Sequence, residues 1–139
     1  MKYYAVIDTN VVVSSMLKHQ SIPWQILNLV NQEVIVPLLS KEILDEYIEV
    51  ITRNKFNFDE SVITGTIEGI KEKAIYLERE ETIEDFIDKD DIVFFEIVLS
   101  ARSTMDAYLI TGNMKHYPVR SYVVTPAQMI EIINKDKTK

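Results

Sequence analysis

The feature that most constrains the fold is the alternation of short apolar runs with longer helical patterns. The runs are rich in β-branched and aromatic residues and occupy residues 3–7, 34–36, 108–111 and 122–124. Runs of this kind are typical of buried strands. Because strand and helix alternate along the chain, we expect an α/β fold in which βα units surround a parallel sheet.

Capping side chains and first-turn prolines mark where the helices should begin. The pattern that follows Asp59 predicts a long helix through Leu77. The segment 92–101 is apolar on every side, so we expect it to be a helix in the centre of the domain. The expected starts are at Ser21, Ser40, Asp59 and Thr125.

One domain accounts for the whole chain. Its 139 residues are 47% hydrophobic, which is enough to bury roughly two-thirds of the unfolded surface. No repeat or low-complexity tract appears, so we expect a single domain over residues 1–135 and a polar tail over 136–139. The acidic segment 78–85 should be a solvated connection, with Phe86 and Ile87 as its anchors.

Charge and cysteine content exclude several kinds of protein. The net charge of −7 argues against a protein that binds nucleic acid through overall positive charge. A local basic rim is still possible. The absence of cysteine excludes disulfides, thiolate metal sites and a catalytic thiol, which leaves oxygen and imidazole ligands. The candidates for a basic rim are Lys115, Arg102, Arg53 and Lys55.

Neither a signal peptide nor a membrane span is expected. Lys2 is the only leading positive charge, and Asp8 interrupts the first apolar run too early for a signal-peptide core. No later segment offers 18 uncharged apolar residues. We therefore expect a soluble, cytoplasmic protein with no membrane partner.

Asp8 poses a physical problem because it directly follows the strand pattern of residues 3–7, and the apolar run resumes at Val11. An unpaired ionised Asp in apolar surroundings costs several kcal/mol. Two interpretations are open. Asp8 can make a turn with Asn10, or it can bind a cation.

Other polar residues are predicted to lie at the same edge of the sheet as Asp8. Asn113 follows the strand at 108–111, Asp91 begins the buried helix, and Glu46 lies at the border of the apolar stripe of its helix. Ligands of open parallel sheets gather at the carboxyl ends of the strands. Carboxylates a few ångströms apart repel by roughly 4 kcal/mol per pair, so they take up protons or a cation. Oxygen ligands suit Mg²⁺ or Mn²⁺, which assist phosphodiester hydrolysis.

Four segments in this order resemble the PIN-domain family, in particular the branch described as toxin components of toxin–antitoxin pairs. They are VIDTNV, EILDEYIEVITRNKF, DKDD and AYLITGNMKHYP. The resemblance implies a three-layer α/β/α sandwich with a central parallel sheet of four or five strands. It also implies a metal-dependent ribonuclease with an RNA substrate, an antitoxin protein as partner and a homodimeric state.

The resemblance assigns roles residue by residue. Asp8, Glu46 and Asp91 match the family's carboxylates, which implies that they are catalytic and hold Mg²⁺ or Mn²⁺. Asn10 and Thr111 match polar residues that orient these carboxylates or the attacking water.

One departure from the family pattern and one ambiguity remain. Asn113 stands where many relatives have an aspartate, and its neutral amide puts a second metal site in doubt. Asp88 and Asp90 are close enough in sequence to Asp91 for either of them to be the main ligand instead. Acids at these positions also cap a helix and complement its dipole.

Two other functions stay open beside the ribonuclease. A haloacid-dehalogenase-type phosphatase also begins with an aspartate after the first strand, but it needs a second acid where this chain has Asn10. A non-catalytic binding module would fit a site weakened at Asn113. His116 is either a proton shuttle or phosphate contact, or simply a residue of a turn.

Overall fold

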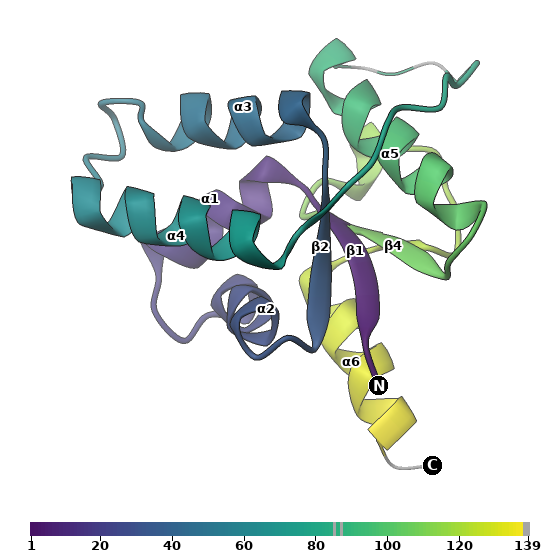
Figure 1. The fold of residues 1–139 in the computed structure, drawn as a ribbon, viewed down its shortest axis with the longest axis horizontal. Helices are drawn as coiled ribbons and strands as arrows, with labels where there is room; N and C mark the ends of the chain where they lie inside the picture. Colours follow the sequence, from purple (N-terminus) through teal and green to yellow (C-terminus); the bar gives the residue numbers. More distant parts are fainter. Residues whose placement is uncertain (85, 87, 138–139) are drawn as a thin grey trace.

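The computed structural model describes residues 1–84, 86 and 88–137, and these form a five-stranded parallel sheet flanked by helices (Figure 1). The strand order is β3-β2-β1-β4-β5, and every neighbouring pair is parallel. The expected α/β class, with a sandwich around a parallel sheet of four or five strands, is confirmed. The strands are β1 (Tyr3–Ile7), β2 (Ile35–Leu39), β3 (Ile75–Tyr76), β4 (Ala107–Ile110) and β5 (Val123–Val124).

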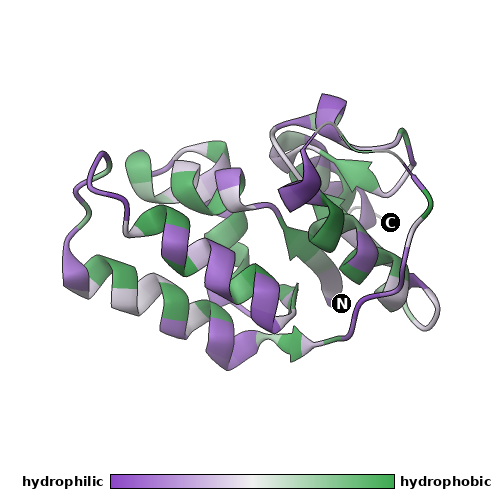
Figure 2. Ribbon diagram, turned by 90° about the horizontal axis from the view of Figure 1, so that it is seen from above, coloured by the Kyte–Doolittle hydropathy of each residue, from purple (hydrophilic) through white to green (hydrophobic). Residues whose placement is uncertain are grey.

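Helices cover the sheet and extend beyond it. α5 packs against β1, β2 and β4, whereas α2 packs against β2 and α6, and α4 packs against α2 and α3. Figure 2 shows hydrophobic residues concentrated in the strands, while the peripheral helices alternate between hydrophobic and hydrophilic residues. The helices are α1 (Thr9–Leu17), α2 (Ile22–Asn31), α3 (Lys41–Ile51), α4 (Glu60–Lys73), α5 (Ile92–Arg102) and α6 (Pro126–Lys137), with short 3₁₀ turns η1 (Lys89–Asp91) and η2 (Met114–His116).

The predicted helix starts are confirmed by their caps. Ser21, Ser40 and Thr125 each accept a hydrogen bond from the backbone N–H three residues later, at 3.2 Å. These bonds satisfy donors that the first helical turn leaves without an intrahelical partner. Asp59 also stands at the N-cap of α4, without a side-chain capping bond.

The predicted helix through Leu77 is too long. α4 ends at Lys73, and β3 follows it at once as the edge strand beside β2. The Leu77 N–H then donates to the Leu39 carbonyl at 2.8 Å, which extends this pairing. The helical spacing of apolar residues misled the prediction because an edge strand of two residues has no periodicity of its own.

The polar tail predicted at residues 136–139 begins inside the last helix. α6 continues to Lys137, and the Tyr3 hydroxyl donates to Asp136 Oδ2 at 2.7 Å, which ties the end of the helix to β1. Residues 138–139 lie outside the described residues, as does Ile87, one of the two predicted anchors. Phe86, the other anchor, packs edge-on against Phe95 with ring centroids 5.6 Å apart.

The expected burial of α5 is confirmed. Phe94, Phe95, Ile97 and Val98 are each at most 1% exposed. Glu96 in the same helix is also buried, at 4% exposed, which the apolar pattern did not predict. In the part of the chain that the structure describes, no helix is both long and apolar enough to cross a bilayer.

The order of the strands creates a switch point at the centre of the sheet. From β1 the chain builds β2 and β3 on one side, and then returns to place β4 on the other side. Ile7 pairs with Ile110, so the next residues, Asp8 and Thr111, emerge together at the carboxyl ends of β1 and β4. Open α/β sheets bind their ligands at such a point.

Candidate functional site

Asp8 lies at this switch point, at the N-cap of α1, and is only 5% exposed. Its Oδ2 accepts hydrogen bonds from Thr111 Oγ1 at 2.7 Å, the Tyr117 hydroxyl at 3.0 Å and Asn10 Nδ2 at 3.3 Å. Among the described residues, no buried polar side-chain atom lacks a hydrogen-bond partner. These bonds offset the desolvation of the Asp8 carboxylate.

Asp91, at the N-cap of α5, is the second acid in this environment. It stands between η1 and α5, and its side chain is 14% exposed. Asp91 Oδ2 lies 3.0 Å from His116 Nδ1, and Oδ1 lies 3.5 Å from the Tyr117 hydroxyl. Because that hydroxyl is 3.0 Å from Asp8 Oδ2, the two carboxylate oxygens are no farther apart than the sum of these two distances.

The neighbouring acids of Asp91 do not share this position. Asp88 and Asp90 are exposed, and Asp88 Oδ1 accepts the Asp90 N–H at 2.9 Å as the cap of η1. The geometry therefore places Asp91, rather than Asp88 or Asp90, beside Asp8.

Glu46 approaches from α3. It is half-buried and accepts a hydrogen bond from Thr9 Oγ1, the residue directly after Asp8. The other two glutamates on this part of α3 face elsewhere, since Glu42 pairs with Arg79 and Glu49 with Arg53.

Burial perturbs the pKa values of all three acids, and the charges of neighbouring carboxylates add to the shifts of Asp91 and Glu46. Burial raises the pKa of Asp8, against the lowering effect of the bonds from Thr111 and Tyr117. Burial and the charge of Asp8 raise the pKa of Asp91 to about 6, although His116 opposes the shift. Burial also raises the pKa of Glu46 against the lowering effect of the bond from Thr9, and the charges of Asp8, Asp90 and Asp91 add to the rise. A cluster of this kind favours the uptake of a proton or a cation.

Polar residues tie the two strand ends together around these acids. Asn10 Oδ1 accepts the Gly112 N–H at 3.1 Å, and the buried Thr111 accepts the Asn113 N–H at 3.0 Å on its Oγ1. A Cβ on Gly112 would meet Asn10 Oδ1 at 3.3 Å, so glycine suits this close approach. Asn113 itself is exposed and enters the network through its backbone.

A comparison with known protein families identifies the fold to which this site belongs. The PIN domain family matches residues 4–115, a range that begins in β1 and ends in η2. The chain belongs to the PIN-domain family. PIN domains are in general nucleases, which are hydrolases, and they typically bind divalent metal ions. A comparison with curated proteins gives no match.

The oxygen donors of this PIN domain suit a hard divalent cation. Mg²⁺ keeps several waters and takes one or two protein carboxylates, a demand that the Asp8 and Asp91 pair can meet. In the described residues, no three His, Cys, Asp or Glu side chains stand close enough to form a complete set of protein ligands. Among the described residues the three carboxylates therefore do not form a preformed cage, and water would complete the coordination of a cation held here.

Two contact residues were not assigned to the site from the sequence. Tyr117 lies within the segment AYLITGNMKHYP, which carries the family resemblance, and Thr9 lies within VIDTNV. The location of Tyr117 and Thr9 within these two segments is the sequence signal that could have assigned them to the site. Burial and the charges of Asp8 and Asp91 raise the pKa of the Tyr117 phenol, so it acts as a hydrogen-bond donor between the two acids. The turn η2 is what folds Tyr117 and His116 back onto the site.

Three of the four cations predicted as candidates for a basic rim do not contact the described residues of the candidate site. Arg53 pairs with Glu49 on α3, and the Lys55 ammonium lies 5.1 Å from the Phe56 ring. Arg102 donates to the Ala107 carbonyl at 2.6 Å, at the amino end of β4 and thus opposite the site. Lys115, in η2, is the member of the group that stands next to a site residue.

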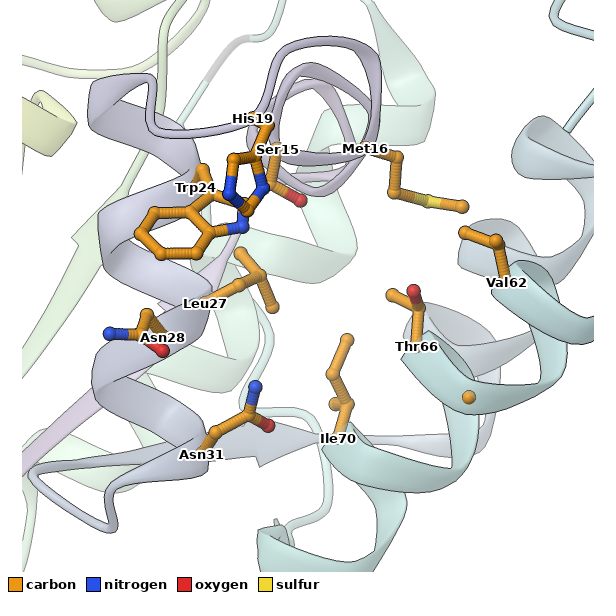
Figure 3. Close-up of a pocket in the computed structure, with 11 residues that line it drawn as sticks. Ser15, Met16, His19, Trp24, Leu27, Asn28, Asn31, Val62, Thr66 and Ile70 are labelled. Carbon is orange, nitrogen blue, oxygen red and sulfur yellow. The ribbon is translucent and has the colours of Figure 1, made fainter.

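A cavity of about 440 Å³ lies apart from the acids, between α1, α2 and α4 (Figure 3). His19 and Trp24 meet at its edge, with ring centroids 4.7 Å apart. Among the described residues, no carboxylate lines this cavity. This cavity therefore lacks the carboxylates that meet at the strand ends.

Proposed function

We propose that this PIN domain is a Mg²⁺- or Mn²⁺-dependent endoribonuclease whose cation is held by Asp8 and Asp91, with Glu46 as the third carboxylate. The observation that carries the proposal is the convergence of Asp8 and Asp91 on the Tyr117 hydroxyl at the switch point of the sheet. When bound, the cation supplies an activated water and stabilises the negative charge that develops on the phosphoryl group.

The other residues of the site hold these carboxylates in place. Thr111 and Asn10 orient Asp8, Thr9 orients Glu46, and His116 orients Asp91. Partners of this kind restrict the rotation of a ligand carboxylate and adjust its basicity. Asn113, a neutral residue at the rim, fits a site built for one cation rather than two.

The proposal extends to partners. The resemblance to toxin components supports a role as the toxin of a toxin–antitoxin pair, with an antitoxin protein and a second copy of the chain as partners. RNA as substrate and a cytoplasmic location belong to the same proposal.

Family membership favours the nuclease over the phosphatase. The amide of Asn10, at the position where a phosphatase needs an acid, bonds to the Gly112 N–H and to Asp8 and is engaged in structure. The non-catalytic module remains an outcome of the test below.

The test is cleavage of labelled RNA by the purified protein with Mg²⁺ or Mn²⁺ and with a chelator. We expect cleavage that requires the cation and is lost in Asp8→Asn and Asp91→Asn, which remove the negative charge and keep the shape of the side chain. Glu46→Gln should reduce cleavage, while Glu49→Gln, on the same helix but paired with Arg53, should not.

Cleavage that persists with chelator, or in pure Asp91→Asn protein, would contradict the assignment. A wild-type protein that neither cleaves RNA nor binds Mn²⁺ in a titration would favour the binding module. Rapid hydrolysis of a chromogenic phosphomonoester would favour the phosphatase.

A further inference from the structure

Glu96 is a buried charge outside the candidate site. It lies on α5 among Phe94, Phe95 and Ile97 and is only 4% exposed. A buried carboxylate is tolerated where it is paired and hydrogen-bonded. Glu96 meets this condition through Arg79, whose Nε donates to Oε1 at 2.7 Å, and through the Thr82 N–H, which donates to Oε2 at 2.9 Å.

Arg79 belongs to the segment that leaves β3 and runs beside α5 (Figure 1). Its Nη1 donates to Glu42 Oε2 on α3 at 2.8 Å while the rest of the guanidinium holds Glu96. Arginine suits such a bridge because its planar group presents several donors in fixed directions. One side chain thus links α3 to α5.

These two helices carry two of the three candidate carboxylates. Glu42 stands one helical turn before Glu46 on α3, and Glu96 stands five residues after Asp91 at the start of α5. The separation of α3 and α5 therefore sets the separation of Glu46 and Asp91. No other ion pair among the described residues connects these two helices.

We propose that Arg79 is a positioning residue that, with Glu42 and Glu96, holds α3 and α5 at the spacing at which Glu46 and Asp91 serve one cation. The role in cation binding rests on the proposed function, whereas the link between the helices does not. Partners one step removed from metal ligands change metal affinity, and a more remote partner has a smaller effect of the same sign.

The variant that tests this is Glu42→Gln. It removes the ionic bond to α3 and leaves Arg79 paired with Glu96, so no buried charge is left alone. The matched control is Glu49→Gln, which also breaks an exposed Glu–Arg pair on α3, but one that stays within the helix. The two glutamate side chains are similarly exposed, at 52% and 61%. Arg79→Lys is a second variant, since it keeps the charge and loses the two-armed bridge.

Two measurements are made on each protein. The first is the Kd for Mn²⁺, for which we expect Glu42→Gln to be weaker by about threefold to tenfold and Glu49→Gln to be unchanged. The second is the distance distribution between spin labels at Asp45→Cys on α3 and Ser103→Cys at the end of α5. The chain has no cysteine of its own, so these are the only labelled positions. We expect a narrow distribution in the parent protein and in Glu49→Gln, and a broader one in Glu42→Gln.

The two hypotheses fail in different ways. Glu42→Gln and Arg79→Lys proteins that keep the narrow distribution and the parent Mn²⁺ affinity would overturn the positioning role. If the parent protein has a narrow distance distribution but binds no Mn²⁺, the proposed nuclease function is overturned. In that case a broadened distance distribution in Glu42→Gln would still support the link between the helices. Equal losses of Mn²⁺ affinity in Glu42→Gln and Glu49→Gln would overturn the positioning role as well.

Discussion

Asp91→Asn should stabilise this protein above about pH 6 when no divalent cation is present, even though it should abolish cleavage. The reason is that burial and the nearby charge of Asp8 raise the pKa of Asp91 to about 6 in the folded state, from an ordinary value of 3.8. A group with a raised folded pKa stabilises the fold below its unfolded pKa, and this stabilisation is lost as the pH rises through the folded pKa. Asparagine does not titrate, so the variant avoids the loss.

The magnitude follows from the shift. Each pKa unit corresponds to about 1.4 kcal/mol, so a rise from 3.8 to about 6 sets a ceiling of about 3 kcal/mol. Solvent reaches part of the carboxyl group and screens its repulsion, which lowers our expectation to about 1–2 kcal/mol. The stability difference between Asp91→Asn and wild type should therefore grow by this amount between about pH 4 and about pH 7.5.

The assay is urea unfolding of both proteins in a chelating buffer at several pH values in that range. Asp88→Asn is the comparison variant because this exposed residue caps η1 and its charge contributes less than burial and Asp8 to the raised pKa of Asp91, so its gain should be smaller than that of Asp91→Asn. Mn²⁺ at about one hundred times its Kd should then stabilise wild type by about 2.7 kcal/mol and leave Asp91→Asn unchanged. A stability difference that stays constant with pH, or that falls as the pH rises, would refute the raised pKa of Asp91 in the folded protein.

Three other substitutions give separate tests. Tyr117→Phe removes a donor to the buried Asp8 carboxylate and should destabilise the cation-free protein by about 1.5–3 kcal/mol in urea unfolding. An unchanged free energy of unfolding would contradict the bond between Tyr117 and Asp8. Tyr3→Phe removes the bond to Asp136, so it should lower the free energy of unfolding by about 0.5–1.5 kcal/mol and speed hydrogen exchange at the end of α6. Equal exchange rates in the two proteins would mean that the bond does not hold the helix end. Phe94→Ala should cost about 3–5 kcal/mol, because Phe94 is 0% exposed; a loss below about 1 kcal/mol would show that α5 is not packed as described.

Much of the fold followed from local patterns. The runs at residues 3–7 and 108–111 overlap β1 and β4, and the caps at Ser40 and Thr125 begin the helices that the structure contains. β3 was missed because it has two residues at a sheet edge, and its pairing with Leu38 and Leu39 is a tertiary contact. Local propensity cannot predict a strand that exists only because a neighbouring strand offers free hydrogen-bonding groups.

Part of the candidate site could be predicted from the sequence. Asp8 and Thr111 follow the ends of strands, and the topology of a parallel sheet brings such ends together. The family resemblance pointed to Asp91 but left Asp88 and Asp90 open, because all three precede the same helix and differ only in the direction that η1 gives them.

By itself, the sequence determined the class of fold, the family and the supply of oxygen donors, because periodicity, capping and ordered motifs are local properties of the chain. Tertiary structure alone decided that Tyr117 stands between Asp8 and Asp91, and that Arg79 joins α3 to α5. Each of these contacts joins residues far apart in the chain, and a hydrogen bond depends on distances of a few tenths of an ångström that only the packed core establishes.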